Sequence, residues 1–151
     1  MDLALDWSPP ARPTGAAFTD DIDARALALY RRNLTNILAL CKASGIRPIL
    51  IPHYLNEAAL TAETNYGWIP YVRDKDLPRM IESFNRVLLD VAGDNGDMAL
   101  DFVHETAFDP TNFADQGHFN SRGSRKFAEL VAHALLEAGL VRATGDAEVS
   151  R

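Results

Sequence analysis

Three stretches of helical periodicity, separated by short apolar runs, constrain this chain more than any other feature of its sequence. The stretches cover about residues 23–44, 77–92 and 121–138, and each carries an apolar stripe at steps of three and four residues. Two runs lie between them, Ile49-Leu50-Ile51 and Met98 to Val103, and both are too short for a helix. Runs of this kind are typical of buried strands. Leu3-Ala4-Leu5 is a third candidate strand.

The alternation of strand and helix predicts a parallel sheet with helices on both faces. We therefore expect the α/β class, with three layers in the order helix, sheet, helix (α/β/α). A chain of 151 residues fits one domain of this kind. The pattern occupies residues 1–140, whereas residues 141–151 lack an apolar stripe and are expected to form a mobile tail.

The overall charge and composition exclude several classes of function. The net charge of −6 argues against nucleic acid and anionic membranes as partners, because both require a cationic surface. The single cysteine, Cys41, excludes an internal disulfide and most cysteine-based metal sites. No apolar run approaches the ~20 residues of a membrane-spanning helix, and residues 1–6 lack the features of a signal peptide. The default expectation is therefore a cytoplasmic protein.

Two long connections follow predicted strands and are the expected location of a ligand site. They cover residues 52–75 and 104–120, and in open α/β sheets the loops beyond the carboxyl ends of the strands bind ligands. His53 and His104 each end a predicted strand, so we expect them to line the same cleft. The first connection also carries four aromatic side chains: Tyr54, Tyr66, Trp68 and Tyr71. These rings fit a substrate platform and a small satellite core equally well.

Asp115 and His118 form the most informative pair of polar residues in the second connection. They are three positions apart, with Gly117 between them, just before the third helical stretch. A tight turn would bring the Asp115 carboxylate onto one nitrogen of the His118 ring, which fixes the tautomer and leaves the other nitrogen as a proton acceptor. Spacing alone favours a structural interpretation, in which Asp115 caps a turn and Asn120 or Ser121 caps the helix.

The sequence around this pair resembles the C-terminal block of the SGNH, or GDSL-type, ester hydrolases. In that family an Asp-x-x-His motif, a following Gly and an amphipathic helix with an early Phe-Ala supply two members of a Ser-His-Asp triad. The matching residues here are Asp115, His118, Gly123, Phe127 and Ala128. Residues 30–38 and 43–52 resemble the helix that leads into the fourth strand of the same family, so the resemblance covers roughly residues 26–138.

The resemblance implies an SGNH-hydrolase-like (flavodoxin-like) fold and hydrolysis of a carboxylic ester through a serine acyl-enzyme. His118 would then be the general base, and Asp115 would orient it. The family's nucleophile lies in a Gly-Asp-Ser motif after the first strand, and this sequence contains no such motif and no counterpart of the family's oxyanion residues. Ser8 follows a candidate strand, but Pro9 and Pro10 prevent the helical turn of a nucleophile elbow. We therefore expect a domain truncated at its N-terminus, and no substantial esterase activity from this chain alone.

Two candidate functions follow from these observations. The first is the C-terminal part of a serine ester hydrolase, acting on a small-molecule ester once the missing segment completes the site. The alternative is a non-catalytic remnant, or pseudoenzyme, that binds a ligand or partner through the same cleft. No cofactor is expected, and no metal, because the histidines and carboxylates lack clustered ligand spacing. The incomplete sheet also predicts self-association through an exposed edge.

Overall fold

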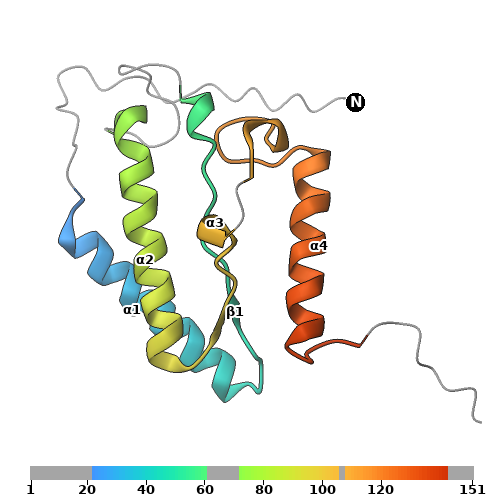
Figure 1. Ribbon diagram of the computed structural model, residues 1–151. Coiled ribbons are helices and arrows are strands. Elements are labelled where there is room, and N and C mark those ends of the chain that lie inside the picture. Colours follow the sequence, from blue (N-terminus) through green and yellow to red (C-terminus); the bar gives the residue numbers. More distant parts are fainter. Residues whose placement is uncertain (1–21, 61–71, 106–107, 143–151) are drawn as a thin grey trace, which may run out of the picture.

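The computed structural model describes residues 22–60, 72–105 and 108–142. In this part of the chain, three long helices surround a two-stranded parallel sheet (Figure 1). The long helices are α1 (Ala24–Ala43), α2 (Leu77–Asn95) and α4 (Ser121–Glu137), and the strands are β1 (Ile49–Leu50) and β2 (Met98–Ala99). The shorter elements are the helix α3 (Phe102–Glu105) and the 3₁₀ turns η1 (Glu57–Ala59), η2 (Asp74–Asp76) and η3 (Pro110–Asn112). None of the helices in these ranges is both long and apolar enough to cross a membrane.

The three long helices confirm the three helical stretches predicted from the apolar periodicity. Their ends are explained by local capping residues and glycines. Asp23 caps α1, because its carboxylate accepts a hydrogen bond from the N–H of Arg25 at 2.8 Å. The helix α2 continues beyond residue 92, where the predicted stretch ends, and stops at Gly96 with φ 66°. Asp76 occupies the N-cap position of α2, but its side chain forms no capping hydrogen bond.

The prediction of a three-layer α/β/α, flavodoxin-like fold was wrong. Among the described residues the sheet consists of β1 and β2 alone, paired as Ile49 with Met98 and Leu50 with Ala99. Both apolar runs form shorter strands than predicted, because the chain passes through Pro52 after β1 and turns into α3 at Phe102 after β2. Two such short strands do not form a layer between two sets of helices. The structure is instead mostly helical.

Two of the sequence predictions lie outside the described residues. The third candidate strand, Leu3-Ala4-Leu5, falls before residue 22. The predicted tail of residues 141–151 is described only for Val141 and Arg142.

A cluster of buried apolar side chains lies where α1 and α2 pack against each other and against the strands. Its buried apolar side chains come from α1, β1 and α2: Leu38, Leu50, Leu88, Val91 and Ala92. Tyr30 of α1 and Phe84 of α2 add an edge-to-face contact with ring centroids 5.1 Å apart. The helix α4 lies on the other side of the strands (Figure 1). It contacts η3, and this contact positions the loop that precedes it.

Candidate functional site

The loop between η3 and α4 carries Asp115 and His118 at its tip. Backbone pairing of Phe113 with Phe119 closes this loop as an antiparallel bridge. Inside the bridge, the N–H of Ala114 donates to the carbonyl oxygen of His118 at 2.8 Å. Residues 115–118 therefore form a tight turn directly before α4, and we call it the Asp115–His118 turn.

The Asp115 carboxylate contacts the His118 ring as the three-residue spacing predicts. Nδ1 of His118 lies 2.9 Å from each carboxylate oxygen. The carboxylate also accepts hydrogen bonds from the N–H groups of Gly117 and His118, at 2.9 and 2.8 Å. These two backbone bonds, and then the ring, lower the pKa of Asp115 and keep it ionised at neutral pH. Because the carboxylate engages Nδ1, Nε2 is the nitrogen on which a general base would act.

The pair is open to solvent. The side chain of His118 is 71% exposed and that of Asp115 is 46% exposed. A reacting group from a substrate or another segment can therefore reach His118 from the solvent. The same exposure means that water screens the charge interaction between the two side chains.

The loop after β1 reaches the Asp115–His118 turn at Asn56, whose backbone N–H donates to the carbonyl oxygen of Gln116 at 2.8 Å. His53 lies earlier in the same loop. Burial lowers the pKa of His53, and the positive charge of protonated His118 lowers it further. Of the residues selected from the sequence, the structure brings Asp115 and His118 into direct contact.

Tyr54 belongs to a cluster of aromatic rings and not to an open platform. Its ring centroid lies 4.9 Å from that of Phe108, 5.4 Å from that of Phe119 and 6.1 Å from that of Phe127. Phe119 and Phe127 are themselves 5.7 Å apart. The cluster fixes the loop after β1 against the N-terminal end of α4, which is the satellite-core interpretation.

The remaining candidate residues are three aromatic residues of the first connection and His104. Trp68 and Tyr71, together with Tyr66, lie outside the described residues. His104 lies within α3, the short helix that follows β2.

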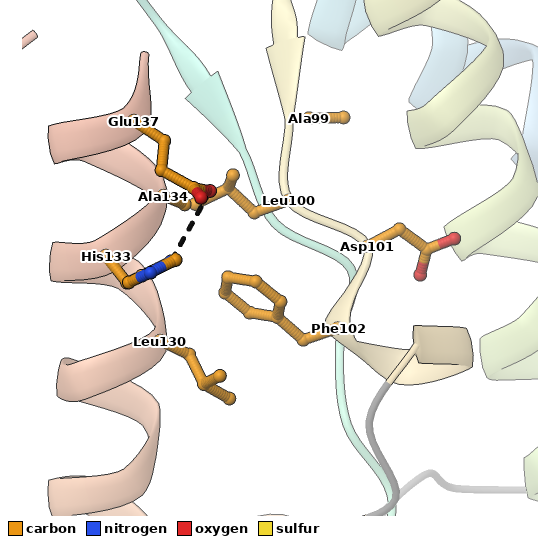
Figure 2. A pocket seen from close by; sticks show the side chains of 8 residues that line it. All are labelled: Ala99, Leu100, Asp101, Phe102, Leu130, His133, Ala134 and Glu137. Carbon is orange, nitrogen blue, oxygen red and sulfur yellow. Dashed lines mark ion pairs between the residues drawn. The ribbon is translucent and has the colours of Figure 1, made fainter. Parts of the chain in front are cut away.

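A groove lies between α4 and the segment from β2 to α3, separate from the Asp115–His118 turn (Figure 2). Its apolar walls are formed by side chains that face one another: Leu100, Phe102, Leu130 and Ala134. An ion pair joins His133 Nδ1 to Glu137 Oε2 at 3.4 Å on the α4 side, whereas Asp101 points away. The groove measures about 380 Å³ and lies along α4, whereas His118 precedes the first turn of that helix.

Sequence reasoning missed two asparagines that support the site. Asn85 is 4% exposed and bonds to the backbone of His53, and Asn56 bonds to the backbone of the Asp115–His118 turn. Asn85 could have been found, because it lies on the apolar face of α2 between Ile81 and Leu88. A polar residue at such a position indicates a buried hydrogen-bonding role.

Within residues 22–60, 72–105 and 108–142, no group of three or more histidine, cysteine or acidic side chains lies close enough to hold a metal ion. Comparisons of the chain with protein-family models, with curated proteins and with solved structures find no match.

Proposed function

We propose that Asp115 and His118 form the general-base pair of an ester-hydrolysing site whose serine nucleophile is supplied by another segment. The observation that supports this most is the approach of His118 Nδ1 to both oxygens of an ionised, solvent-accessible carboxylate. In acyl transfer such a carboxylate orients the imidazole and stabilises the imidazolium that forms when the serine loses its proton. The imidazolium then protonates the leaving group. The resemblance of residues 26–138 to SGNH hydrolases supports an ester as the substrate.

The serines of the described ranges lie in helices or at their ends. They are Ser44, Ser83, Ser121 and Ser124. The hydroxyl of Ser83 donates to the carbonyl oxygen of Arg79 at 2.9 Å, one turn earlier in α2, which is an ordinary structural bond. A nucleophile elbow instead places its serine on a sharp turn between a strand and a helix. We therefore assign the nucleophile to a segment other than these helices.

Hydrolysis of an activated ester tests the role of His118. We expect the purified chain to hydrolyse p-nitrophenyl acetate slowly, and most of that rate to be lost in H118Q. The reason is that the Asp115 carboxylate orients and charge-stabilises this imidazole, whereas an isolated imidazole has no such support. The measurement is p-nitrophenolate release under first-order conditions, with circular dichroism to verify folding.

His133 offers a matched control for this experiment. It is also exposed, at 73%, and also pairs with a carboxylate, Glu137, but at 3.4 Å and across one turn of a regular helix. We expect H133Q to keep the rate of the unmodified chain. Equal losses in H118Q and H133Q would show that His118 is only one more surface imidazole. Stoichiometric labelling of Ser44, Ser83, Ser121 or Ser124 by a serine-directed fluorophosphonate would contradict the assignment of the nucleophile to another segment.

A second candidate function, binding to a partner without catalysis, is supported by exposed apolar side chains on α1 and just before β1 in the sequence. Ile37 and Leu40 of α1 and Ile46 before β1 are 54, 68 and 58% exposed. Among the described residues, β1 pairs with β2 alone, so its second edge has no strand beside it there. Exposed apolar side chains and an unpaired strand edge each favour association, and we propose a second copy of the chain as the partner.

Self-association is expected to depend on this surface. Sedimentation velocity over a range of protein concentrations should show a monomer–dimer equilibrium for the unmodified chain. Ile37→Lys combined with Ile46→Lys should shift it towards monomer, because a buried ammonium group is costly at an apolar interface. The control is Leu136→Lys. Leu136 is also exposed, at 43%, but it lies on α4, away from α1 and β1 in the sequence. A chain that stays monomeric at all concentrations would contradict this second candidate.

A further inference from the structure

Asn120, the N-cap residue of α4, uses every hydrogen-bonding group of its side chain. Its Oδ1 accepts the backbone N–H groups of Arg122 and Gly123, both at 3.0 Å. Its Nδ2 donates to the backbone carbonyl oxygen of Thr111 at 2.7 Å and to that of Phe113 at 3.2 Å. A primary amide has two acceptor sites on its oxygen and two N–H donors, so these bonds occupy all of them.

Capping of α4 needs only the oxygen of this side chain. An N-cap residue acts through one acceptor oxygen, and serine, aspartate and asparagine are about equally effective at this position. The helix therefore does not explain the Nδ2 group of Asn120. Its two acceptors lie in η3 and directly after it, where the chain enters the loop that carries Asp115 and His118.

The Nδ2 group of Asn120 closes the base of this loop. Phe113 lies two residues before Asp115, and Asn120 lies two residues after His118. The bond from Nδ2 to the carbonyl oxygen of Phe113 therefore joins the two ends of the segment that contains the pair. The backbone N–H of Asn120 also donates to the carbonyl oxygen of Asn112 at 3.0 Å, and Asn112 is only 1% exposed. The loop is thus closed on a buried anchor.

We propose that Asn120 is the positioning residue of the Asp115–His118 pair, through the bonds that its Nδ2 donates and separately from its cap of α4. This inference rests on the function proposed above and adds the group that holds the general base against its carboxylate. A base and the group that orients it must be held within a narrow range of geometry by the bonds of neighbouring residues. A loop closed at its base restricts the backbone at positions 115 and 118 in this way.

The carboxylate of Asp115 reports the shape of the loop. It accepts hydrogen bonds from the backbone N–H groups of Gly117 and His118, and these bonds are the largest cause of its lowered pKa. The side chain of His118 lowers the pKa of Asp115 further. Both backbone bonds require the tight turn. Opening the loop at its base would weaken them and raise the pKa of Asp115.

Asn120→Ser separates the two roles of this residue without changing the charge. Serine keeps an oxygen that caps α4, but it has no amide group to donate to Thr111 and Phe113. In the folded variant, the pKa of Asp115 should rise towards the ordinary value of about 3.9, measured by ¹³C NMR of the carboxylate and assigned from its loss in D115N. At alkaline pH, ¹⁵N NMR should show the neutral His118 ring of the unmodified chain with its proton on Nδ1, and a larger share of the Nε2–H tautomer in N120S.

Asn95→Ser is the matched control. The Nδ2 of Asn95 also donates to a backbone carbonyl oxygen, that of Val91 at 2.8 Å, but within α2. This variant should leave both the pKa of Asp115 and the tautomer of His118 unchanged. The proposal is overturned if N120S is folded by circular dichroism and changes neither quantity, because Asn120 would then be a helix cap alone. Equal changes in N120S and N95S would also overturn it.

Hydrogen exchange in the unmodified chain gives a test that needs no variant to fold. The side-chain amide protons of Asn120 should exchange with solvent more slowly than those of Asn33, which is exposed on α1 and whose Oδ1 accepts from Arg32. The reason is that the Asn120 protons are held by two carbonyl oxygens. Equally fast exchange would contradict the closure of the loop by this amide.

Ester hydrolysis connects Asn120 to the proposed function. N120S should slow the release of p-nitrophenolate, and adding N120S to H118Q should cause no further loss, because Asn120 acts through His118. A further loss in the double variant would overturn the positioning role. If the unmodified chain hydrolyses no ester, the proposed function is rejected, and the NMR measurements still decide whether Asn120 positions the pair.

Discussion

Replacing Gly123 with alanine is expected to disrupt the junction between α4 and the Asp115–His118 turn. A Cβ atom at this position would lie 2.0 Å from the carbonyl oxygen of Asn112 and 2.8 Å from Cδ1 of Phe119. The nearer obstacle is backbone and cannot rotate away, and Asn112 is itself buried at 1% exposure. Overpacking typically costs 1–3 kcal/mol, and we expect a loss near the upper end, about 3 kcal/mol in the free energy of unfolding. Urea denaturation followed by circular dichroism measures it.

Gly93 provides the control for this substitution. It lies inside α2, and a Cβ atom there would meet nothing within 4 Å. Alanine is favoured over glycine within helices by roughly 0.5–1 kcal/mol, so Gly93→Ala should stabilise the chain slightly. The two glycine-to-alanine changes are thus expected to have opposite signs. A Gly123→Ala chain as stable as the original would contradict the close packing of α4 on η3.

The long helices were predictable because their information is local. An apolar stripe with a period of 3.6 residues, a capping Asp23 and a terminating Gly96 lie within each element or next to it. The sheet was not predictable in this way. Whether Ile49-Leu50-Ile51 continues as a strand depends on which backbone groups lie beside it, and these come from distant parts of the chain. The Asn85 amide, far along the sequence, takes the N–H and C=O of His53 that a longer strand would offer to a neighbour.

The site divides in the same way between local and distant information. The contact of Asp115 with His118 follows from three-residue spacing and a glycine in the turn, and the structure contains it. The position of the loop after β1 depends on Asn56 and Asn85, whose side chains bond to the backbone of Asp115 and of His53, far away in the sequence. The role of Tyr54 could not be predicted from its residue type and position in the sequence. An aromatic residue after a strand suits a platform or a core, and only the positions of Phe108, Phe119 and Phe127 decide for the core.

Leu38→Ala is expected to cause the second large loss of stability. Leu38 is 2% exposed and belongs to the core cluster that joins α1 to α2 and β1. Truncating a buried leucine removes its transfer free energy and leaves a cavity, at a typical cost of 2–5 kcal/mol. Small domains have only about 5–15 kcal/mol of stability in total, so this single change removes a large part of it. The expected result is a clear fall in the midpoint of urea unfolding.

Leu40→Ala is the matched comparison, two residues further along the same helix. Leu40 is 68% exposed, and alanine is at least as good a helix former as leucine, so the free energy of unfolding should change by less than about 0.5 kcal/mol. Both variants replace leucine with alanine in the same helix, so their effects on helix propensity are the same. Any difference in stability between them therefore reports on the packing of the core face of α1. Equal losses for the two variants would contradict the packing of α1 on α2 through Leu38.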